Sequence, residues 1–411
     1  MAVSRRTALA FALLLWPGPL PAGQAGALVS QALEVQGAVA RIRGLPFVRA
    51  VPMEVKDRDA IRAYAVGRMD REYTAEELRA KSESLVAWGF VRAPFDLRSL
   101  YEELLAEQIG GYYDPYEDTF FIADWLPPLL QKPIMAHELT HALQDQHFDL
   151  EPLLHGVEGN DDASLAGAAV VEGEGLAVML DYALRPLGLT FETLPGLESV
   201  VDARVPADAA GFRVYATAPP IVKETLVFPY LQGLLFVRAA KARGGWDAVS
   251  RLYRALPAST EQVLWPEKYF GERDEPTPVR LPDVGRLLGP SWRRIDSNVL
   301  GELGLRVALR GPEGSESGNA PARGWDGDRY ELYEDRRGGT ALVHVSVWDA
   351  EPEAEEFARA WRARLDADRP DTPHHVEREG ARVVGLLNVA RERVGAVVRA
   401  LIAAAPPGPL P

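Results

Sequence analysis

The sequence contains no cysteine and no run of basic residues. The lack of cysteine excludes a disulfide framework, a thiol nucleophile and a lipidated cysteine after a leader. The chain of 411 residues has a net charge of −14, and because lysine and arginine accumulate nowhere along it, nucleic acid is not expected as a partner. Hydrophobic residues make up 47% and charged residues 25%, which is typical of a folded globular protein.

Residues 1–27 have the layout of a bacterial signal peptide. Arg5 and Arg6 precede an apolar run at residues 8–16, and small residues follow up to Ala27. The run is too short to cross the roughly 30 Å hydrocarbon core of a membrane, and no later segment is expected to be long and apolar enough. The sequence therefore predicts export to the periplasm or the extracellular space, with no transmembrane span after removal of the leader.

The rest of the chain divides into four segments by composition and periodicity. We expect a mixed helical region or propeptide at 28–110, a mainly helical catalytic domain at 111–285, a smaller α+β accessory domain at 290–402 and a disordered tail at 403–411. The proline-rich stretch 274–282 indicates the boundary before the accessory domain. The predicted fold class is α+β, with a small sheet whose edge strand lies beside the catalytic helices.

One strand and three helices are predicted in the catalytic segment. The strand covers 118–123 after a turn at 110–115, and its free edge could pair with an extended peptide. The helices are expected to begin at Pro133, at Asp162 after capping residues from Asn160 on, and at Pro229, with the last one ending at Gly244-Gly245. In the accessory segment, strands are predicted at 329–333, 341–347, 375–377 and 382–387, and helices at 353–365 and 390–402.

The stretch His137-Glu138-Leu139-Thr140-His141 indicates a metal site. Residues four apart on a helix project from the same face, so His137 and His141 can share one ion. Glu138 lies about 100° round the axis and reaches a water beside the metal rather than the metal itself. We predict two metal ligands and a general base here; the alternative is a surface helix with two solvated histidines.

His147 is one candidate for the third ligand, because it has the spacing of the motif HExxHxxGxxH. In that motif the glycine ends the helix and lets the third histidine fold back to the metal. Gln144 occupies the glycine position here. If the helix continues, His147 lies about 9 Å beyond His141 along the axis, out of reach of the ion.

Two glutamates on the next predicted helix are the other candidates. Glu172 is centred on an apolar face of small residues, where a buried carboxylate is costly unless it is paired or binds a cation. Glu174 points to the other side and is expected to be a solvated charge. Gly173 and Gly175 indicate close approach by another helix or by the metal. We predict Glu172 as the third ligand; pairing with an arginine is the alternative.

The six residues His137 to Ala142 resemble the active-site helix of the thermolysin-like metallopeptidases. This resemblance implies a zincin-like catalytic domain in which His137 and His141 bind one zinc ion and Glu138 is the general base. Val171-Glu172-Gly173 is similar to the third-ligand helix of the gluzincin aminopeptidases, which implies that Glu172 completes the site. The 30 residues between His141 and Glu172 exceed the spacing of both relatives, so an added loop is expected between the two helices.

A donor besides the metal is needed for the oxyanion formed in peptide hydrolysis. Tyr230-Leu231-Gln232-Gly233 resembles the Tyr-x-x-Gly helix start of the gluzincin aminopeptidases, which implies that Tyr230 is this donor; a core tyrosine is the alternative. His155 is a weaker candidate. Tyr112 and Tyr113 could line the cleft, although packing is their simpler role. Ser259 to Gln262, followed by Trp265-Pro266, is similar to uncharacterised exported bacterial HExxH proteins.

These features predict an exported zinc metallopeptidase that acts on peptide or protein substrates. Two alternatives stay open. One is a metzincin-like peptidase that uses His147 as the third ligand. The other is a non-catalytic, zinc-containing envelope protein whose C-terminal domain binds a partner.

Overall fold

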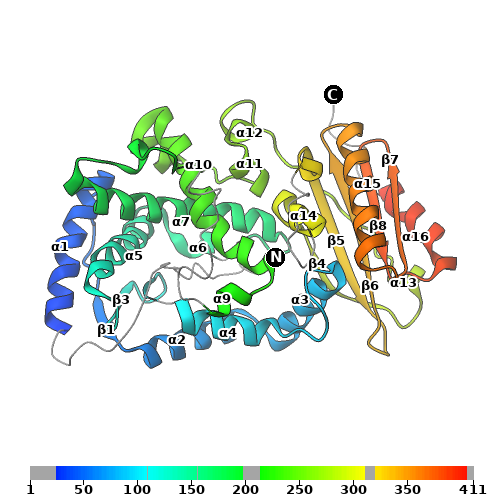
Figure 1. Ribbon diagram of the computed structural model, residues 1–411, viewed down its shortest axis with the longest axis horizontal. Helices are drawn as coiled ribbons and strands as arrows, with labels where there is room; N and C mark the ends of the chain where they lie inside the picture. The colour runs from blue at the N-terminus through cyan, green and yellow to red at the C-terminus, as the bar shows by residue number, and fades with distance from the viewer. Residues whose placement is uncertain (1–24, 109, 155, 198–212, 311–319, 405–411) are drawn as a thin grey trace.

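Two β-sheets lie towards opposite ends of the molecule, with most of the helices between and around them (Figure 1). The computed structural model describes residues 25–404 except 109, 155, 198–212 and 311–319. The chain is mixed α+β, as predicted, with a mainly helical first part and a C-terminal sheet. Most of the expected leader and of the expected C-terminal tail lie outside the described residues.

The smaller sheet has three strands in the order β1-β3-β2. Their bounds are Met53–Lys56 for β1, Gly111–Asp114 for β2 and Thr119–Ala123 for β3. The predicted strand at 118–123 is confirmed, but it lies in the centre of the sheet and not at its edge. The turn predicted at 110–115 was wrong, because the β-favouring pair Tyr112-Tyr113 continues the strand and the chain reverses only after Asp114.

Four long helices form the region around the HExxH motif, which α5 carries. They are α1 (Ala25–Arg43), α5 (Pro128–Phe148), α7 (Asp161–Leu184) and α10 (Pro220–Leu252). The predicted α7 is confirmed, with Asn160 as its N-cap. The starts predicted at Pro133 and Pro229 were wrong, because Pro128 and Pro220 already occupy the first helical position and both later prolines lie inside their helices. The predicted break at Gly244-Gly245 is present as non-helical backbone inside α10.

Short elements lie between these helices and after the last of them. They are α6 (Leu150–Leu154), η1 (Arg185–Leu187), η2 (Phe191–Thr193), α9 (Arg213–Thr217), α11 (Thr260–Leu264) and α12 (Pro266–Phe270). Of these, α6 lies in the added loop that was expected between the motif and Glu172. The loop therefore carries a helix of its own.

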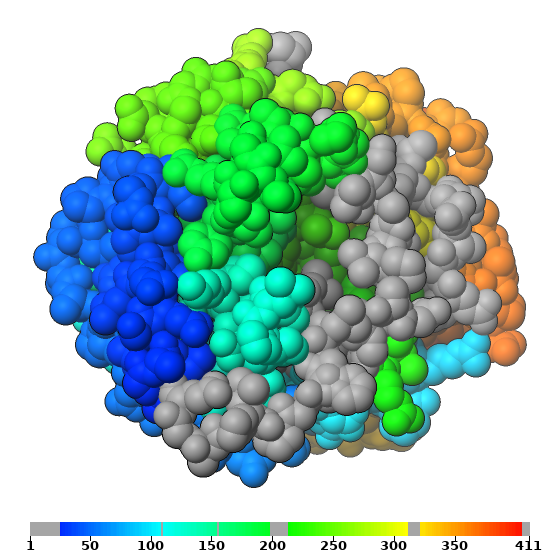
Figure 2. All heavy atoms as spheres, turned by 60° about the vertical axis from the view of Figure 1, so that its left-hand side comes forward, coloured from blue at the N-terminus to red at the C-terminus, as the bar shows by residue number. Residues whose placement is uncertain are grey.

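The helices before the motif pack into several different cores. Leu28 and Val35 of α1 lie in one hydrophobic cluster with Met135 and Leu139 of α5, and the space-filling view shows α1, in blue, at the molecular surface (Figure 2). The next helices are α2 (Arg58–Glu72), α3 (Ala75–Trp88) and α4 (Leu97–Gln108). Trp88 of α3 lies in the core of the C-terminal sheet. Packing thus crosses the predicted boundaries on both sides of the catalytic segment.

The C-terminal sheet has five antiparallel strands in the order β4-β5-β6-β8-β7. The strands are β4 (Arg293–Asn298), β5 (Trp325–Glu334), β6 (Thr340–Trp348), β7 (His374–Glu379) and β8 (Arg382–Leu387). The helices are α13 (Gly285–Leu288), α14 (Gly301–Arg310), α15 (Glu351–Asp368) and α16 (Arg391–Ala404), with the turn η4 (Ala320–Ala322). Every strand and helix predicted here is present; β4, α13, α14 and η4 were not predicted.

Alternation along the strands gives this sheet two buried faces. Leu342 of β6 belongs to the cluster with α3, α14 and α15, whereas its neighbour Val343 belongs to the cluster with α13 and α16. The sheet therefore lies between two layers of helices. Helix α3 comes from the N-terminal part of the chain, so the sheet's core is completed by a segment that lies far away in sequence.

One helix of the described residues, Asp161–Leu187, is long and apolar enough to cross a membrane by length and composition alone. The sequence was not expected to contain such a segment. In its most apolar window 67% of the residues are buried inside the protein, because α7 packs against α1, α5 and α10. Its apolar character therefore follows from its central place in the core.

Candidate metal centre

The side chains of His137, His141 and Glu172 converge on one point between α5 and α7. The Nε2 atom of His137 lies 3.1 Å from Glu172 Oε2, and that of His141 lies 3.4 Å from the same oxygen. The two Nε2 atoms are 3.0 Å apart. Ligand atoms placed about 2.1 Å from a tetrahedral zinc ion lie about 3.4 Å from one another, so these three atoms are spaced to hold one small ion.

Contacts on the far sides of the rings orient both histidines. His141 Nδ1 lies 2.8 Å from Gln144 Oε1, and because an amide oxygen can only accept, Nδ1 carries the hydrogen. The ring of His137 lies directly against Gly175 of α7, where an added Cβ atom would be 2.9 Å from its Nδ1. Because Nδ1 of His141 is used by Gln144, its Nε2 is the nitrogen that faces Glu172 and would bind an ion.

Three acceptor atoms that meet in a buried place need a positive charge between them. Glu172 Oε1 is also buried and has no hydrogen-bond partner among the described residues. Burial opposes charge on His141, but the neighbouring Glu172 outweighs it and raises the pKa of His141 to about 9. In turn the histidines lower the pKa of Glu172 against the effect of its burial. The donor set fits a divalent cation, which would replace the proton shared in this cluster.

Glu138 stands beside this cluster and is not part of it. Its Oε2 accepts a hydrogen bond of 3.0 Å from the backbone N–H of Tyr113 in β2. Its Oε1 is buried without a partner among the described residues. Burial raises the pKa of Glu138 to about 8. The edge strand of the small sheet thus fixes one carboxylate oxygen and leaves the other available.

The two tyrosines of β2 pack away from the cluster. The hydroxyl of Tyr113 donates to Asp145 at 2.8 Å, and Tyr112 stacks on Tyr64 and Phe121. Packing, the simpler of their two predicted roles, is what their side chains do. Only the backbone of Tyr113 reaches the site.

Three glycines allow the helices and the histidines to come this close. A Cβ atom on Gly173 would lie 2.2 Å from the carbonyl carbon of Gly233 in α10, and one on Gly175 would lie 2.7 Å from Cε1 of His137. Both close approaches were predicted from the glycines. The crossing of α7 and α10 also brings in Tyr230, whose ring is 5.9 Å from that of His137, centre to centre, at an interplanar angle of 25°.

His147 is outside the cluster, as a continuous helix requires. Helix α5 runs through Gln144 to Phe148, and His147 Nε2 donates to the carbonyl of Pro46 at 2.8 Å. His155, the weaker candidate for the oxyanion donor, lies outside the described residues.

The prediction that Glu174 is a solvated charge was wrong. Its side chain is buried, forms an ion pair with Arg43 of α1 and accepts a hydrogen bond of 2.7 Å from the hydroxyl of Tyr253. The partner that makes this burial possible lies 131 residues away, so no local pattern pointed to it. Gln144 was also missed as a partner of His141, although its position in the motif had singled it out.

A second group of carboxylates near α12 already surrounds the ammonium group of a lysine. Glu261, Asp274 and Asp349 lie within reach of one another, but the ammonium group of Lys268 bonds to all three at 2.7 to 2.8 Å. The lysine thus occupies the place that a cation would take. This cluster is an ion-pair network rather than a second metal centre.

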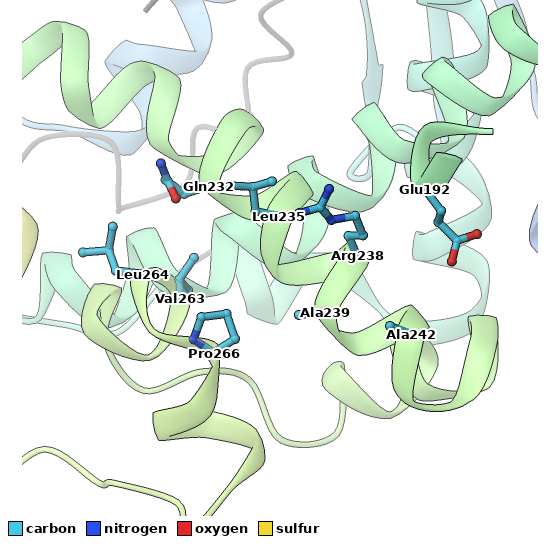
Figure 3. A pocket seen from close by; sticks show the side chains of 9 residues that line it. All are labelled: Glu192, Gln232, Leu235, Arg238, Ala239, Ala242, Val263, Leu264 and Pro266. Carbon is cyan, nitrogen blue, oxygen red and sulfur yellow. The ribbon is translucent and has the colours of Figure 1, made fainter. Parts of the chain in front are cut away.

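A surface cavity of about 460 Å³ lies beside α10 and η2 (Figure 3). It is lined by Glu192, Gln232, Leu235, Arg238, Ala239, Ala242, Val263, Leu264 and Pro266. Gln232 and Tyr230 lie about 200° apart round the helix axis. The cavity therefore opens on the face of α10 that points away from the histidines.

Comparison with known proteins informs only the C-terminal part of the chain. A family described as a domain of unknown function (DUF8575) matches residues 287–406, which is the five-stranded sheet with its helices. No curated protein matches the chain, and no solved structure does. The matched segment contains none of the residues of the metal centre.

Proposed function

We propose that this protein is an exported, zinc-dependent peptidase of gluzincin type. The observation that supports this most strongly is the buried convergence of His137, His141 and Glu172 beside a separately held Glu138. Catalytic zinc sites have three protein ligands and an open position, whereas structural sites are usually closed by four. Among the described residues, the group that could hold the ion has three members.

A zinc ion held by these three residues would supply a Lewis acid that activates water and polarises a carbonyl group. Glu138 is the general base in this proposal. Its free Oε1 takes a proton from the attacking water and passes it to the leaving amine as the C–N bond breaks. Its Oε2 stays on the N–H of Tyr113, which keeps the carboxylate aimed at the site.

Tyr230 is the proposed donor to the oxyanion. Its ring lies beside that of His137, and its helix packs closely against α7 at Gly173. A hydroxyl donor aimed at developing negative charge lowers the barrier of acyl transfer. Tyr230 reaches the site from the interior of α10, not from a helix start as the resemblance implied.

Peptides are the proposed substrates because an edge strand lies at the site. The strand β2 is at the edge of its sheet, and the N–H of its Tyr113 points towards Glu138. An extended peptide can add to such an edge through its backbone. This role was first expected for the strand at 118–123, which the structure places in the centre of the sheet.

The proposal is tested by measuring bound zinc together with cleavage of a peptide library. The wild-type protein and Glu138→Gln should both carry one zinc ion per chain, and only the wild type should cleave peptides. Loss of zinc in His147→Ala, with zinc retained in Glu172→Gln, would favour the metzincin-like alternative. A fourth protein ligand on the metal would favour a structural zinc site in a non-catalytic protein.

A further inference from the structure

Gln144 lies one turn after His141 on α5, and both the oxygen and the nitrogen of its side-chain amide form hydrogen bonds. Its side chain is buried, with Gln144 only 1% exposed. Its Oε1 accepts from His141 Nδ1 at 2.8 Å, and its Nε2 donates to the carbonyl of Val171 at 3.0 Å. Val171 directly precedes Glu172, so the amide connects one expected metal ligand to the backbone beside another.

The direction of the amide follows from its two partners. If the group were reversed, Oε1 would face the carbonyl oxygen of Val171, and two acceptors would meet at hydrogen-bonding distance without a hydrogen. The observed direction therefore places the hydrogen of His141 on Nδ1. The ring then directs Nε2, the nitrogen left for a metal ion, towards Glu172 Oε2, which lies 3.4 Å away.

Helix α7 orients both histidines as well as carrying the carboxylate. It reaches His141 through Gln144 and Val171, and it reaches the ring of His137 at Gly175, where an added Cβ atom would be 2.9 Å from Nδ1. Partners of this kind fix the tautomer and the ring orientation of metal-binding histidines. One rigid helix thus positions all three side chains of the cluster.

We propose that Gln144 is a positioning residue for the metal centre, which it serves by fixing the tautomer and direction of His141. This inference rests on the proposed metal site. It also gives a physical meaning to the residue at the glycine position of HExxHxxGxxH. There a glycine turns the chain, whereas Gln144 lets the helix continue and connects it to α7.

The test is the zinc dissociation constant of the full-length protein, measured by competition with a chelator. Gln144→Ala should weaken zinc binding about 10- to 100-fold, which is typical for loss of an outer partner of a ligand. Gln144→Glu should bind within a few-fold of the wild type, because a buried, protonated carboxyl group accepts from Nδ1 with one oxygen and donates to the carbonyl of Val171 with the other. Gln146→Ala is the matched control, since that amide contacts only backbone groups near Arg49 and should leave zinc affinity unchanged.

Cobalt substitution separates positioning from a merely structural role. The visible bands of the Co²⁺ protein depend on ligand geometry and should shift in Gln144→Ala but return in Gln144→Glu. Unfolding in urea without metal shows whether each variant is folded. Unchanged zinc affinity in Gln144→Ala, or an equal loss in the Ala and Glu variants, overturns the inference.

The same measurements distinguish this inference from the proposed peptidase activity. If the wild type binds zinc and Gln144→Ala weakens that binding, the inference holds even where no peptide is cleaved. If peptides are cleaved but Gln144→Ala binds zinc as tightly as the wild type, only the inference fails. A wild type that binds no zinc overturns both.

Discussion

Arg43 and Glu174 form an ion pair that is almost completely buried between α1 and α7. Arg43 also donates to Ser250 Oγ in α10 at 2.9 Å, and the hydroxyl of Tyr253 completes the surroundings of the carboxylate. Three helices are therefore joined by polar contacts only two residues from Glu172. The N-terminal helix α1, in a region first considered as a propeptide, contributes an essential partner to this network.

Loss of the Arg43 guanidinium group should destabilise the fold strongly. Arg43→Met leaves the carboxylate of Glu174 buried without its cation, which typically costs about 3–5 kcal/mol. Unfolding in urea measures this loss. Arg41→Met is the control, because Arg41 is exposed on the same helix and should change stability by no more than about 0.5 kcal/mol. Equal effects of the two substitutions would show that the buried pair has no special role.

The two closely packed glycines of α7, Gly173 and Gly175, should respond differently to alanine. Gly173→Ala forces α7 and α10 apart and should lower the free energy of unfolding by about 1–3 kcal/mol, as overpacking does. Gly175→Ala displaces the ring of His137 instead, so its main effect should be weaker zinc binding. In the control Gly167→Ala, the new methyl group meets Leu256 at an ordinary 3.5 Å. Unfolding in urea and zinc titration measure the stability and the zinc affinity of the three variants. A different ranking of the variants would contradict this expectation.

Much of the site could be predicted because helix periodicity and residue chemistry are local. The spacing of His137 and His141 placed them on one face, and the apolar surroundings of Glu172 in its helix singled it out. The glycines at 173 and 175 indicated close approaches, and the structure has both. Each of these inferences needed only one helix at a time.

Substitution of each candidate third ligand should separate Glu172 from His147. Glu172→Gln removes an anionic ligand and should weaken zinc binding more than about 100-fold, beyond the loss typical of an outer partner. His147→Ala should leave zinc binding unchanged, because His147 donates to the carbonyl of Pro46 instead. Competition with a chelator measures both constants. The reverse order would mean that the ligand set involves His147.

Stability should fall with rising pH through the carboxyl group of Asp162. Burial raises the pKa of Asp162 to about 7 against the hydrogen bonds from Thr260, and the nearby Asp328 and Glu302 add to the rise. The folded protein therefore retains a proton that the unfolded chain releases at about pH 4. The stability present below about pH 4 is lost between there and about pH 7.

Asp162→Asn should remove this part of the pH dependence. The difference between the two proteins should be a few kcal/mol across that range, since one pKa unit corresponds to about 1.4 kcal/mol. Unfolding in urea from pH 4 to pH 7.5, with a chelator present so that metal loss does not contribute, measures it. If the wild type and the variant follow the same pH profile, Asp162 is not protonated in the folded protein at neutral pH.

Contacts between distant segments account for what the sequence did not predict. Glu174 was expected in solvent because Arg43 lies 131 residues away. The strand at 118–123 was expected at an edge because β1, more than sixty residues earlier, gave no sign that it pairs there. Tertiary packing determines both the burial of Glu174 and the central position of this strand.

Glu138 is the proposed general base of a zinc peptidase. This role is tested by the rate of peptide-library cleavage by the wild type and by Glu138→Gln, compared at equal zinc content. A general base contributes about 10²- to 10⁴-fold, so Glu138→Gln should lose at least about 100-fold in rate with zinc binding intact. Equal rates in the two proteins, or a zinc-loaded wild type that cleaves no peptide, would contradict it.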